Sequence, residues 1–379
     1  MKAGIMVITG GPGTGKTTLI RAIITAAEQN GLEPALMAPT GRAAKRLAIS
    51  SGRDADTIHK ALEASVRETG RTYFERNEAN PLEEDLIIVD EASMLDISLF
   101  YHLLCALKDG ARLILVGDID QLPPVGAGEP LKDLMSWGYV PIVRLKRIFR
   151  QEEGSGIVEN AALIRKGEMC VPDEAGEFRI VYAADDEDAY RIVMDLCREL
   201  NYGNEENKML LQVLSPMYRG VCGVDHLNES LQEMIHGEKV PDGMKFFPGD
   251  KVMQTRNDYE KGIYNGDVGT VWTATPQKVF VRYFDKEVVY EGEERFDLRL
   301  AYAVTVHKSQ GSEYETVIFI LRPSQHNMLQ RNLLYTGVTR ARKNTILVTA
   351  PDALRRALAI QHTGNRYSLF LPFLNHEAL

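Results

Sequence analysis

The sequence predicts an α/β protein with parallel sheets, and three observations support this prediction. Short apolar runs of four or five residues recur and alternate with segments of helical spacing, which is typical of strands buried beneath helices on both faces of a sheet. Two of these runs end in polar clusters, as expected where the carboxyl ends of parallel strands carry a ligand site. The first run leads directly into a glycine-rich loop and a helix, the order that a phosphate-binding loop requires.

The glycine-rich loop follows the apolar run 5–8 and reads Gly-Gly-Pro-Gly-Thr-Gly-Lys-Thr-Thr over residues 10–18. Its glycines let backbone N–H groups curl around a polyphosphate, and the helix that starts here adds partial positive charge. Lys16 is expected to reach the β- and γ-phosphates, and the Thr17 hydroxyl to ligate Mg²⁺. The residues expected to hold the nucleotide are Gly11, Gly13, Thr14, Gly15, Lys16, Thr17 and Thr18. A chance glycine-rich turn is the alternative, which the flanking strand and helix disfavour.

Length, composition and charge indicate an ordinary globular protein of two or three domains. The chain has 379 residues, of which 44% are hydrophobic and 26% charged. It contains no apolar run long enough to span a bilayer, and its four cysteines form no C-x-x-C pair. We therefore expect a cytoplasmic protein without membrane contact, disulfide framework or zinc site. The net charge of −9 counts against a wholly basic nucleic-acid-binding face but leaves room for a local basic channel.

Two adjacent carboxylates, Asp90 and Glu91, follow the apolar run 86–89. Asp90 suits Mg²⁺ through its water shell, and Glu91 suits orientation and deprotonation of an attacking water. An acidic helix N-cap is the alternative, and it would be favoured if the phosphate loop were absent.

Gln121 follows the next buried run, 113–116, and an amide at this sheet edge can touch a γ-phosphate and report its presence. A plain turn is the weaker alternative. Arg150 belongs to the basic stretch 144–151. It is a candidate arginine finger, or else part of a surface basic patch.

The segments between these clusters predict further local structure. After a strand at 35–38, Thr40 is a plausible cap for a basic helix that could hold a phosphate or form a solvated face. His59, in a short helix over 57–62, would by itself be an ordinary, partly buried histidine. The polar stretch 63–85 predicts a protruding hairpin or loop.

The second half repeats the alternation of strand and helix more loosely. Arg340 and Arg342 lie two apart and cannot share one helix face, so one could reach a phosphate while the other binds structure. Residues 152–156 have the composition of a linker, and the tail after Arg366 is apolar enough to pack on the body. We expect strands near 181 and at 210–214, 316–320 and 345–348, helices at 185–200, 224–235 and 332–342, and a small inserted β-barrel at 248–295.

The order of these clusters resembles a superfamily 1 DNA helicase of the RecD-like type, the 5′-to-3′ branch, over residues 5–350. The matching segments, in chain order, are GGPGTGKTT, APTGRAAKRL, TIHKAL, DEASM, GDIDQLPPVGAG, RIFRQ, TVHKSQGSEY and YTGVTRAR. Residues 213–228 and 257–271 also resemble stretches typical of RecD-like helicases, more than those of the UvrD-like, 3′-to-5′ branch.

The resemblance implies two RecA-like domains with ATP in the cleft between them. Domain 1A would comprise residues 1–150, with a hairpin insertion, 1B, at about 63–85 that acts as a strand-separating pin. Domain 2A would comprise 151–247 and 298–379, and an SH3-like β-barrel, 2B, would comprise 248–297.

The resemblance also implies an activity and its residues. ATP hydrolysis with Mg²⁺ would drive movement on single-stranded DNA, including single-strand/duplex junctions, 5′-to-3′, in DNA repair or recombination. The implied catalytic residues are Lys16, Glu91, Gln121, Arg150, Gln310 and Arg340; the metal residues are Thr17 and Asp90; the DNA contacts are Pro39, Thr40, His59, Thr305 and His307.

The sequence departs from the family pattern at its start. The glutamine motif that reads adenine and the family's N-terminal domain have no counterpart here, so either this is a trimmed core or the base is held by other means. Two other functions stay open: a module that binds single-stranded DNA but turns over ATP poorly, and a P-loop enzyme acting on a small molecule. The second-half cluster of His307, Gln310 and Arg340 argues against the latter.

Overall fold

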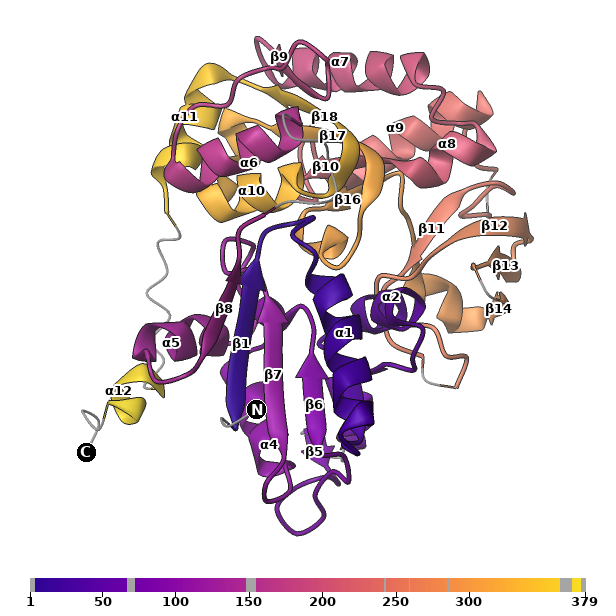
Figure 1. Cartoon of the computed structure of the whole chain (residues 1–379). Coiled ribbons are helices and arrows are strands. Elements are labelled where there is room, and N and C mark those ends of the chain that lie inside the picture. Colours follow the sequence, from indigo (N-terminus) through magenta and orange to yellow (C-terminus); the bar gives the residue numbers. More distant parts are fainter. Residues whose placement is uncertain are drawn as a thin grey trace. The chain divides into compact units, whose positions relative to one another are not determined.

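The computed structural model describes residues 4–66, 72–147, 155–241, 243–258, 260–284, 286–361 and 370–375. The chain forms two compact units. The first comprises Met1–Glu153 together with Gly364–Leu379, and the second Gly154–Thr363 (Figure 1).

A parallel six-stranded sheet forms the centre of the first unit, in the order β3-β2-β6-β7-β1-β8. The expected strands at 5–8, 35–38, 86–89 and 113–116 are confirmed. Two further strands, β3 and β8, were not predicted, because one has two residues and the other carries a charged residue in a short run. The strand bounds are β1 Ile5–Gly10, β2 Pro34–Ala38, β3 Asp56–Thr57, β6 Leu86–Val89, β7 Arg112–Gly117 and β8 Ile142–Leu145.

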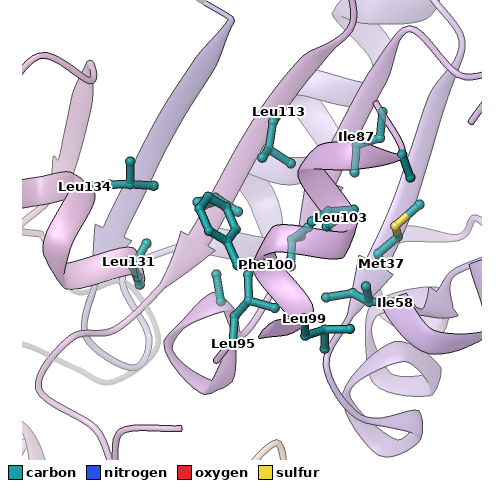
Figure 2. Close-up of a cluster of buried hydrophobic side chains, with 14 of the residues drawn as sticks. Met37, Ile58, Ile87, Leu95, Leu99, Phe100, Leu103, Leu113, Leu131 and Leu134 are labelled. Carbon is teal, nitrogen blue, oxygen red and sulfur yellow. The ribbon is translucent and has the colours of Figure 1, made fainter. Parts of the chain in front are cut away.

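Helices cover both faces of this sheet because successive strand residues point to opposite sides. Ile88 packs in one core with helices α1 and α2, and its neighbour Ile87 packs in the other with α4 and α5. Figure 2 shows the second core, in which Phe100 and Leu103 of α4 lie against the strands. The helix bounds are α1 Lys16–Gln29, α2 Gly41–Ser51, α4 Ile97–Cys105 and α5 Pro130–Trp137.

Smaller elements of the first unit agree with local sequence signals. Thr40 caps α2 by accepting a hydrogen bond from Ala43 N at 3.3 Å, as expected. The short helix α3, Ile58–Ala61, precedes an antiparallel hairpin of β4, Ala64–Val66, and β5, Thr72–Phe74. The hairpin expected within 63–85 is therefore present, although residues 67–71 lie outside the described residues.

The C-terminal helix α12, Phe370–Leu374, belongs to the first unit. Phe370 contacts Phe100 edge to face, with ring centroids 5.8 Å apart. The sequence-based division assigned this tail to the second domain with 298–379, whereas its apolar residues pack in the first unit's core.

The second unit also has a parallel sheet, in the order β16-β10-β17-β18-β9. Helices α7 and α9 pack on one face through a core that includes Val193, Leu227 and Ile318. The strands are β9 Phe178–Tyr182, β10 Leu211–Ser215, β16 Ala303–Thr305, β17 Tyr314–Leu321 and β18 Ala341–Thr349; the helices are α6 Gly156–Lys166, α7 Asp186–Glu199, α8 Glu205–Leu210, α9 Val224–His236, α10 Arg331–Val338 and α11 Pro351–Ala359.

An antiparallel five-stranded sheet is inserted between α9 and β16, in the order β14-β13-β12-β11-β15. The predicted β-rich insertion is confirmed, but among the described residues β14 and β15 do not pair, so the sheet is open rather than a closed barrel. A 3₁₀ segment, Gly292–Asp297, joins these two edge strands. The strands are β11 Lys251–Gln254, β12 Val268–Ala274, β13 Lys278–Arg282, β14 Glu287–Glu291 and β15 Leu298–Leu300.

The expected helix over 332–342 is wrong in its second half. Helix α10 ends at Val338, and Ala341 already pairs with Tyr314 of β17. The apolar run of β18 needs this register beside β17, so the chain leaves the helix at residue 339. Arg340 therefore lies in the turn, and Arg342 lies in a strand.

Across the described ranges, no helix combines the length and apolarity that crossing a bilayer requires.

Candidate functional site

The phosphate loop lies at the carboxyl end of β1, as expected from its sequence. Gly10 is the last residue of β1 and pairs with Leu145 of β8. A Cβ on Gly10 would lie 2.6 Å from Thr14 Oγ1 and 2.9 Å from Leu145 Cβ, so no larger residue fits. Gly13 and Gly15 have φ values of +71° and +84°, a conformation that glycine adopts at no steric cost. The loop is thus held in a tight backbone curl before α1 begins.

Lys16, the first residue of α1, folds back over this loop. Its Nζ donates hydrogen bonds to the carbonyls of Gly10 at 2.7 Å and Gly11 at 3.0 Å. The same Gly11 carbonyl accepts a bond from Thr14 Oγ1 at 2.8 Å. The ammonium therefore lies over the loop, at the N-terminus of a helix, where the dipole favours an anion.

Asp90 and Glu91 follow β6 on the same edge of the sheet. Glu91 has a φ of +51°, a left-handed conformation that is strained for a non-glycine residue, and its N–H donates to Asp90 Oδ1 at 2.9 Å. Burial, then the neighbouring Glu91 charge, raises the pKa of Asp90 to about 6, against the opposing influence of Lys16 and Arg46. Arg46 lies on α2, so this helix directs a positive charge toward the carboxylates.

The end of β7 and the loop that follows it pack closely against the segment after Asp90 and Glu91. A Cβ on Gly117 would lie 2.9 Å from the backbone N of Ser93, so the two loops approach as closely as glycine allows. Gln121 is buried, and its Nε2 donates to Asp118 Oδ2 at 3.4 Å. Asp118, also buried, accepts a further bond from Asp120 N at 3.1 Å. Sequence reasoning singled out Gln121 and missed Asp118, although an acid three residues before it was a visible signal.

The residues expected to contact DNA in the first unit lie near the start of α2 and in α3. Pro39 and Thr40 are half-buried, and the Thr40 hydroxyl is engaged as the helix cap. His59 is half-buried, with its ring 5.9 Å from that of Phe74 in the hairpin. Burial lowers the pKa of His59, partly offset by Asp96. Both interpretations of His59, as a packed histidine and as a DNA contact, fit this position.

In the second unit, polar residues cluster after β16. Thr305 ends this strand, and its Oγ1 accepts a bond from Lys308 N at 3.2 Å. His307 begins a 3₁₀ turn, His307–Ser309, and burial lowers its pKa. Gln310 follows and is buried. These residues therefore lie where a short strand gives way to a polar loop.

Arg340 is 3% exposed and is joined to this cluster through backbone carbonyls. Its Nε donates to Thr336 O and its NH1 to Ser312 O, both at 3.1 Å. Arg342 instead bonds Glu313 through its Nε, at 3.1 Å from Oε2. No described carboxylate pairs with Arg340, whereas Arg342 pairs with Glu313. That one of these arginines reaches a phosphate while the other binds structure stays a prediction.

One expected catalytic residue, Arg150, lies outside the described residues, as do residues 152–154 of the expected linker 152–156. Of its other two residues, Ser155 is buried and Gly156 begins α6. Within the first unit, the structure brings together the phosphate loop, Asp90–Glu91 and the Gln121 loop. Within the second, Arg340 is bonded to the backbone of Ser312, two residues after Gln310.

Family comparisons match three successive parts of the chain. Residues 1–127 match an AAA domain, residues 227–283 match the SH3 domain of ATP-dependent RecD-like DNA helicases, and residues 300–348 match a UvrD-like helicase C-terminal domain. The RecD subunit of the RecBCD enzyme from Mycolicibacterium smegmatis is 34% identical over 97% of this chain and 73% of its own length. This chain belongs to the family of RecD-like ATP-dependent DNA helicases.

A second relative of this RecD-like chain is the ATP-dependent RecD2 DNA helicase of Deinococcus radiodurans. It is 39% identical over 96% of this chain, which spans 50% of that relative's length. The fold agrees with solved structures of more distant helicases. Bacteroides Pif1 in complex with ADP-AlF3 and single-stranded DNA has a TM-score of 0.57 at 21% identity, covering 99% of this chain and 93% of that one. Pif1 from Candida albicans has a TM-score of 0.56 at 20% identity, covering 94% and 93%.

Proposed function

We propose that this RecD-like chain is an ATP-driven motor that moves 5′-to-3′ along single-stranded DNA and opens single-strand/duplex junctions. The observation that supports this most strongly is Arg340. It is a buried arginine in the turn before β18, at the end of the second parallel sheet where β17 and β18 begin, held by two backbone carbonyls and by no described carboxylate. A guanidinium so placed suits a phosphate oxygen, and the first unit already contains a phosphate loop.

In this proposal the first unit binds the nucleotide and positions the water. Lys16 contacts the β- and γ-phosphates, Glu91 orients and deprotonates the attacking water, and Gln121 contacts the γ-phosphate with its amide fixed by Asp118. The backbone N–H groups of the glycine-rich loop, through Thr18, provide the remaining contacts to the phosphates.

Thr17 and Asp90 are the residues that would hold Mg²⁺. Their chemistry fits the ion, because a hydroxyl and a carboxylate are hard oxygen ligands. The raised pKa of the half-buried Asp90 reflects a partly desolvated carboxylate that a cation would stabilise. When bound, Mg²⁺ would neutralise charge on the phosphate oxygens.

The second unit supplies the response to the nucleotide. Gln310 and Arg340, together with Arg150, would meet the γ-phosphate when ATP draws the RecA-like domains 1A (1–150) and 2A (151–247, 298–379) together. Loss of phosphate removes that attraction, so the affinity of each domain for DNA alternates through the cycle. The two domains would then hold the single-stranded DNA in turn, domain 1A through Pro39, Thr40 and His59 and domain 2A through Thr305 and His307. The 1B hairpin would separate the DNA duplex.

The cellular setting is part of the same proposal. The similarity of this chain to the RecD subunit of a RecBCD enzyme supports a role in DNA repair or recombination. All four cysteines are free thiols, as is usual in a reducing compartment, which supports the cytoplasm.

ATP hydrolysis, titrated with a single-stranded oligonucleotide, tests the motor, and strand displacement tests its direction. We expect saturable stimulation by the oligonucleotide and unwinding of duplexes with 5′ overhangs only. Unwinding from 3′ overhangs alone would refute the polarity. Tight DNA binding with no stimulated hydrolysis would instead support a DNA-binding module, and hydrolysis indifferent to DNA would support a small-molecule P-loop enzyme.

A further inference from the structure

Lys308, immediately after His307, is tied to the inserted antiparallel sheet. Its Nζ donates to Asn265 Oδ1 at 2.6 Å, across 43 residues of sequence. Asn265 lies in the connection from β11 to β12, within a segment that the function described above does not use. This bond joins the polar loop after β16 to the inserted sheet.

The connection that carries Asn265 is itself well ordered by hydrogen bonds. Asn265 N donates to Asn257 Oδ1 at 2.9 Å, and Gly266, with a φ of +98°, donates to Gln254 O at 2.8 Å. Tyr264 N donates to Asp267 Oδ2 at 3.0 Å. The Asn265 side chain is therefore presented from a fixed backbone rather than from a free loop.

The inserted sheet is in turn anchored to the parallel sheet through buried polar side chains. Lys251 of β11 donates to Leu211 O at 3.1 Å and to Gln212 Oε1 at 3.0 Å. The neighbouring Asp250 accepts from the Tyr302 hydroxyl at 2.9 Å, just before β16 begins. The position of Asn265 is thus fixed relative to the strand that ends at Thr305.

The electrostatics of Lys308 indicate what this bond does. Burial, followed by the nearby charge of Arg299, lowers the pKa of Lys308. Its side-chain partner is a neutral amide, and no described carboxylate pairs with it. A neutral acceptor orients the ammonium against repulsion from Arg299 without cancelling its charge. The charge therefore remains available to an anion.

We propose that Asn265 is a positioning residue that holds the Lys308 ammonium for a backbone phosphate of single-stranded DNA. The inference rests on the proposed function and extends it. The inserted sheet contributes to DNA binding through Lys308, by fixing a lysine on the loop between Thr305 and Gln310. Pre-organising one long side chain removes the entropy cost of ordering it when the strand binds.

A double-mutant cycle tests this coupling. The binding of a fluorescent oligo(dT) is measured by anisotropy at several salt concentrations for the wild type, Asn265→Ala, Lys308→Ala and the double variant. We expect Asn265→Ala to weaken binding about three- to tenfold, the size of one typical hydrogen bond. Its log–log salt slope should match the wild type. Lys308→Ala should weaken binding further and reduce that slope by about 0.7, the value for one phosphate of a single strand.

The double variant should bind as Lys308→Ala does, because Asn265 acts only through Lys308. Asn265→Asp keeps the acceptor oxygen but adds a charge that cancels the ammonium, so we expect it to weaken binding as Lys308→Ala does. Gln277→Ala, at an exposed turn of the same sheet, is the control and should bind as the wild type. Melting temperatures of all variants confirm that each remains folded.

Two results would overturn the inference. One is unchanged binding in Asn265→Ala. The other is additive losses in the double variant, which would indicate independent roles. Both are distinct from failure of the proposed function, in which the wild type itself would not bind the oligonucleotide.

Discussion

Lys16 and Arg340 are cationic groups held in the same way but with different consequences. Lys16 is half-exposed, and its one nitrogen is bonded to the carbonyls of Gly10 and Gly11 in the phosphate loop itself. Arg340 is buried, and two different nitrogens of its guanidinium bond to carbonyls of Ser312 and Thr336.

The difference indicates how each cation would meet a phosphate. The lysine ammonium is a compact charge on a flexible stem, and loop carbonyls engage two of its three donors. The planar guanidinium can keep its backbone bonds, because Arg has five donors in a fixed fork. The ammonium could therefore turn toward a phosphate on its flexible stem, whereas the guanidinium would present its remaining donors in a fixed direction.

The largest expected effect is on Lys16→Ala. This variant loses the ammonium that we propose contacts both phosphates, so ATP hydrolysis should fall by at least about 10³-fold, with nucleotide binding also weakened. Steady-state phosphate release and a fluorescent-nucleotide titration measure the two quantities. Turnover close to that of the wild type would mean that the glycine-rich loop does not bind the reacting phosphates.

Arg340→Ala should lower turnover by about 10²- to 10³-fold while nucleotide affinity changes by about threefold or less. Arg340→Lys should not restore turnover, since an ammonium lacks the planar fork that lets one side bond the carbonyls while the other side faces a phosphate. A turnover within twofold of the wild type in Arg340→Ala would remove this residue from the mechanism.

The sequence predicted the first unit more completely than the second. Its strands are uninterrupted apolar runs, and its loop glycines have a steric reason to be there, so both strand bounds and site residues could be located. The end of α10 was mispredicted because residues 339–342 are compatible with a helix, and only pairing with β17 converts them to a strand. Lys308 was missed because its partner Asn265 is distant in sequence.

A variant of Lys251 tests whether this buried lysine stabilises the attachment of the inserted sheet to the parallel sheet of the second unit. Truncation in Lys251→Ala leaves the buried acceptors Leu211 O and Gln212 Oε1 without their donor. We expect a loss of about 3 kcal/mol in the free energy of unfolding, measured by urea denaturation. Exposed Lys278→Ala, on the same inserted sheet, is the matched control and should change stability by less than about 0.5 kcal/mol. Equal stability of the two variants would contradict a structural role for the buried lysine.

The smallest expected effect is a pH dependence from His307. Burial lowers its pKa below the ordinary 6.5, so near pH 6 the unfolded chain takes up a proton that the folded chain does not. The contribution of neutral His307 to the free energy of unfolding is therefore complete above pH 6.5, and it declines as the pH falls toward the lowered pKa. His307→Asn should show a flatter dependence of melting temperature on pH. An NMR titration placing the pKa of His307 at or above 6.5 would contradict this.

The most direct test of the central claim is a structure of the chain with a non-hydrolysable ATP analogue and Mg²⁺. We expect Lys16 Nζ and the Arg340 guanidinium to lie about 3 Å from γ-phosphate oxygens of one nucleotide, with Arg340 still bonded to Ser312 O. A bound nucleotide that Lys16 contacts while Arg340 remains remote from every phosphate would contradict the motor mechanism.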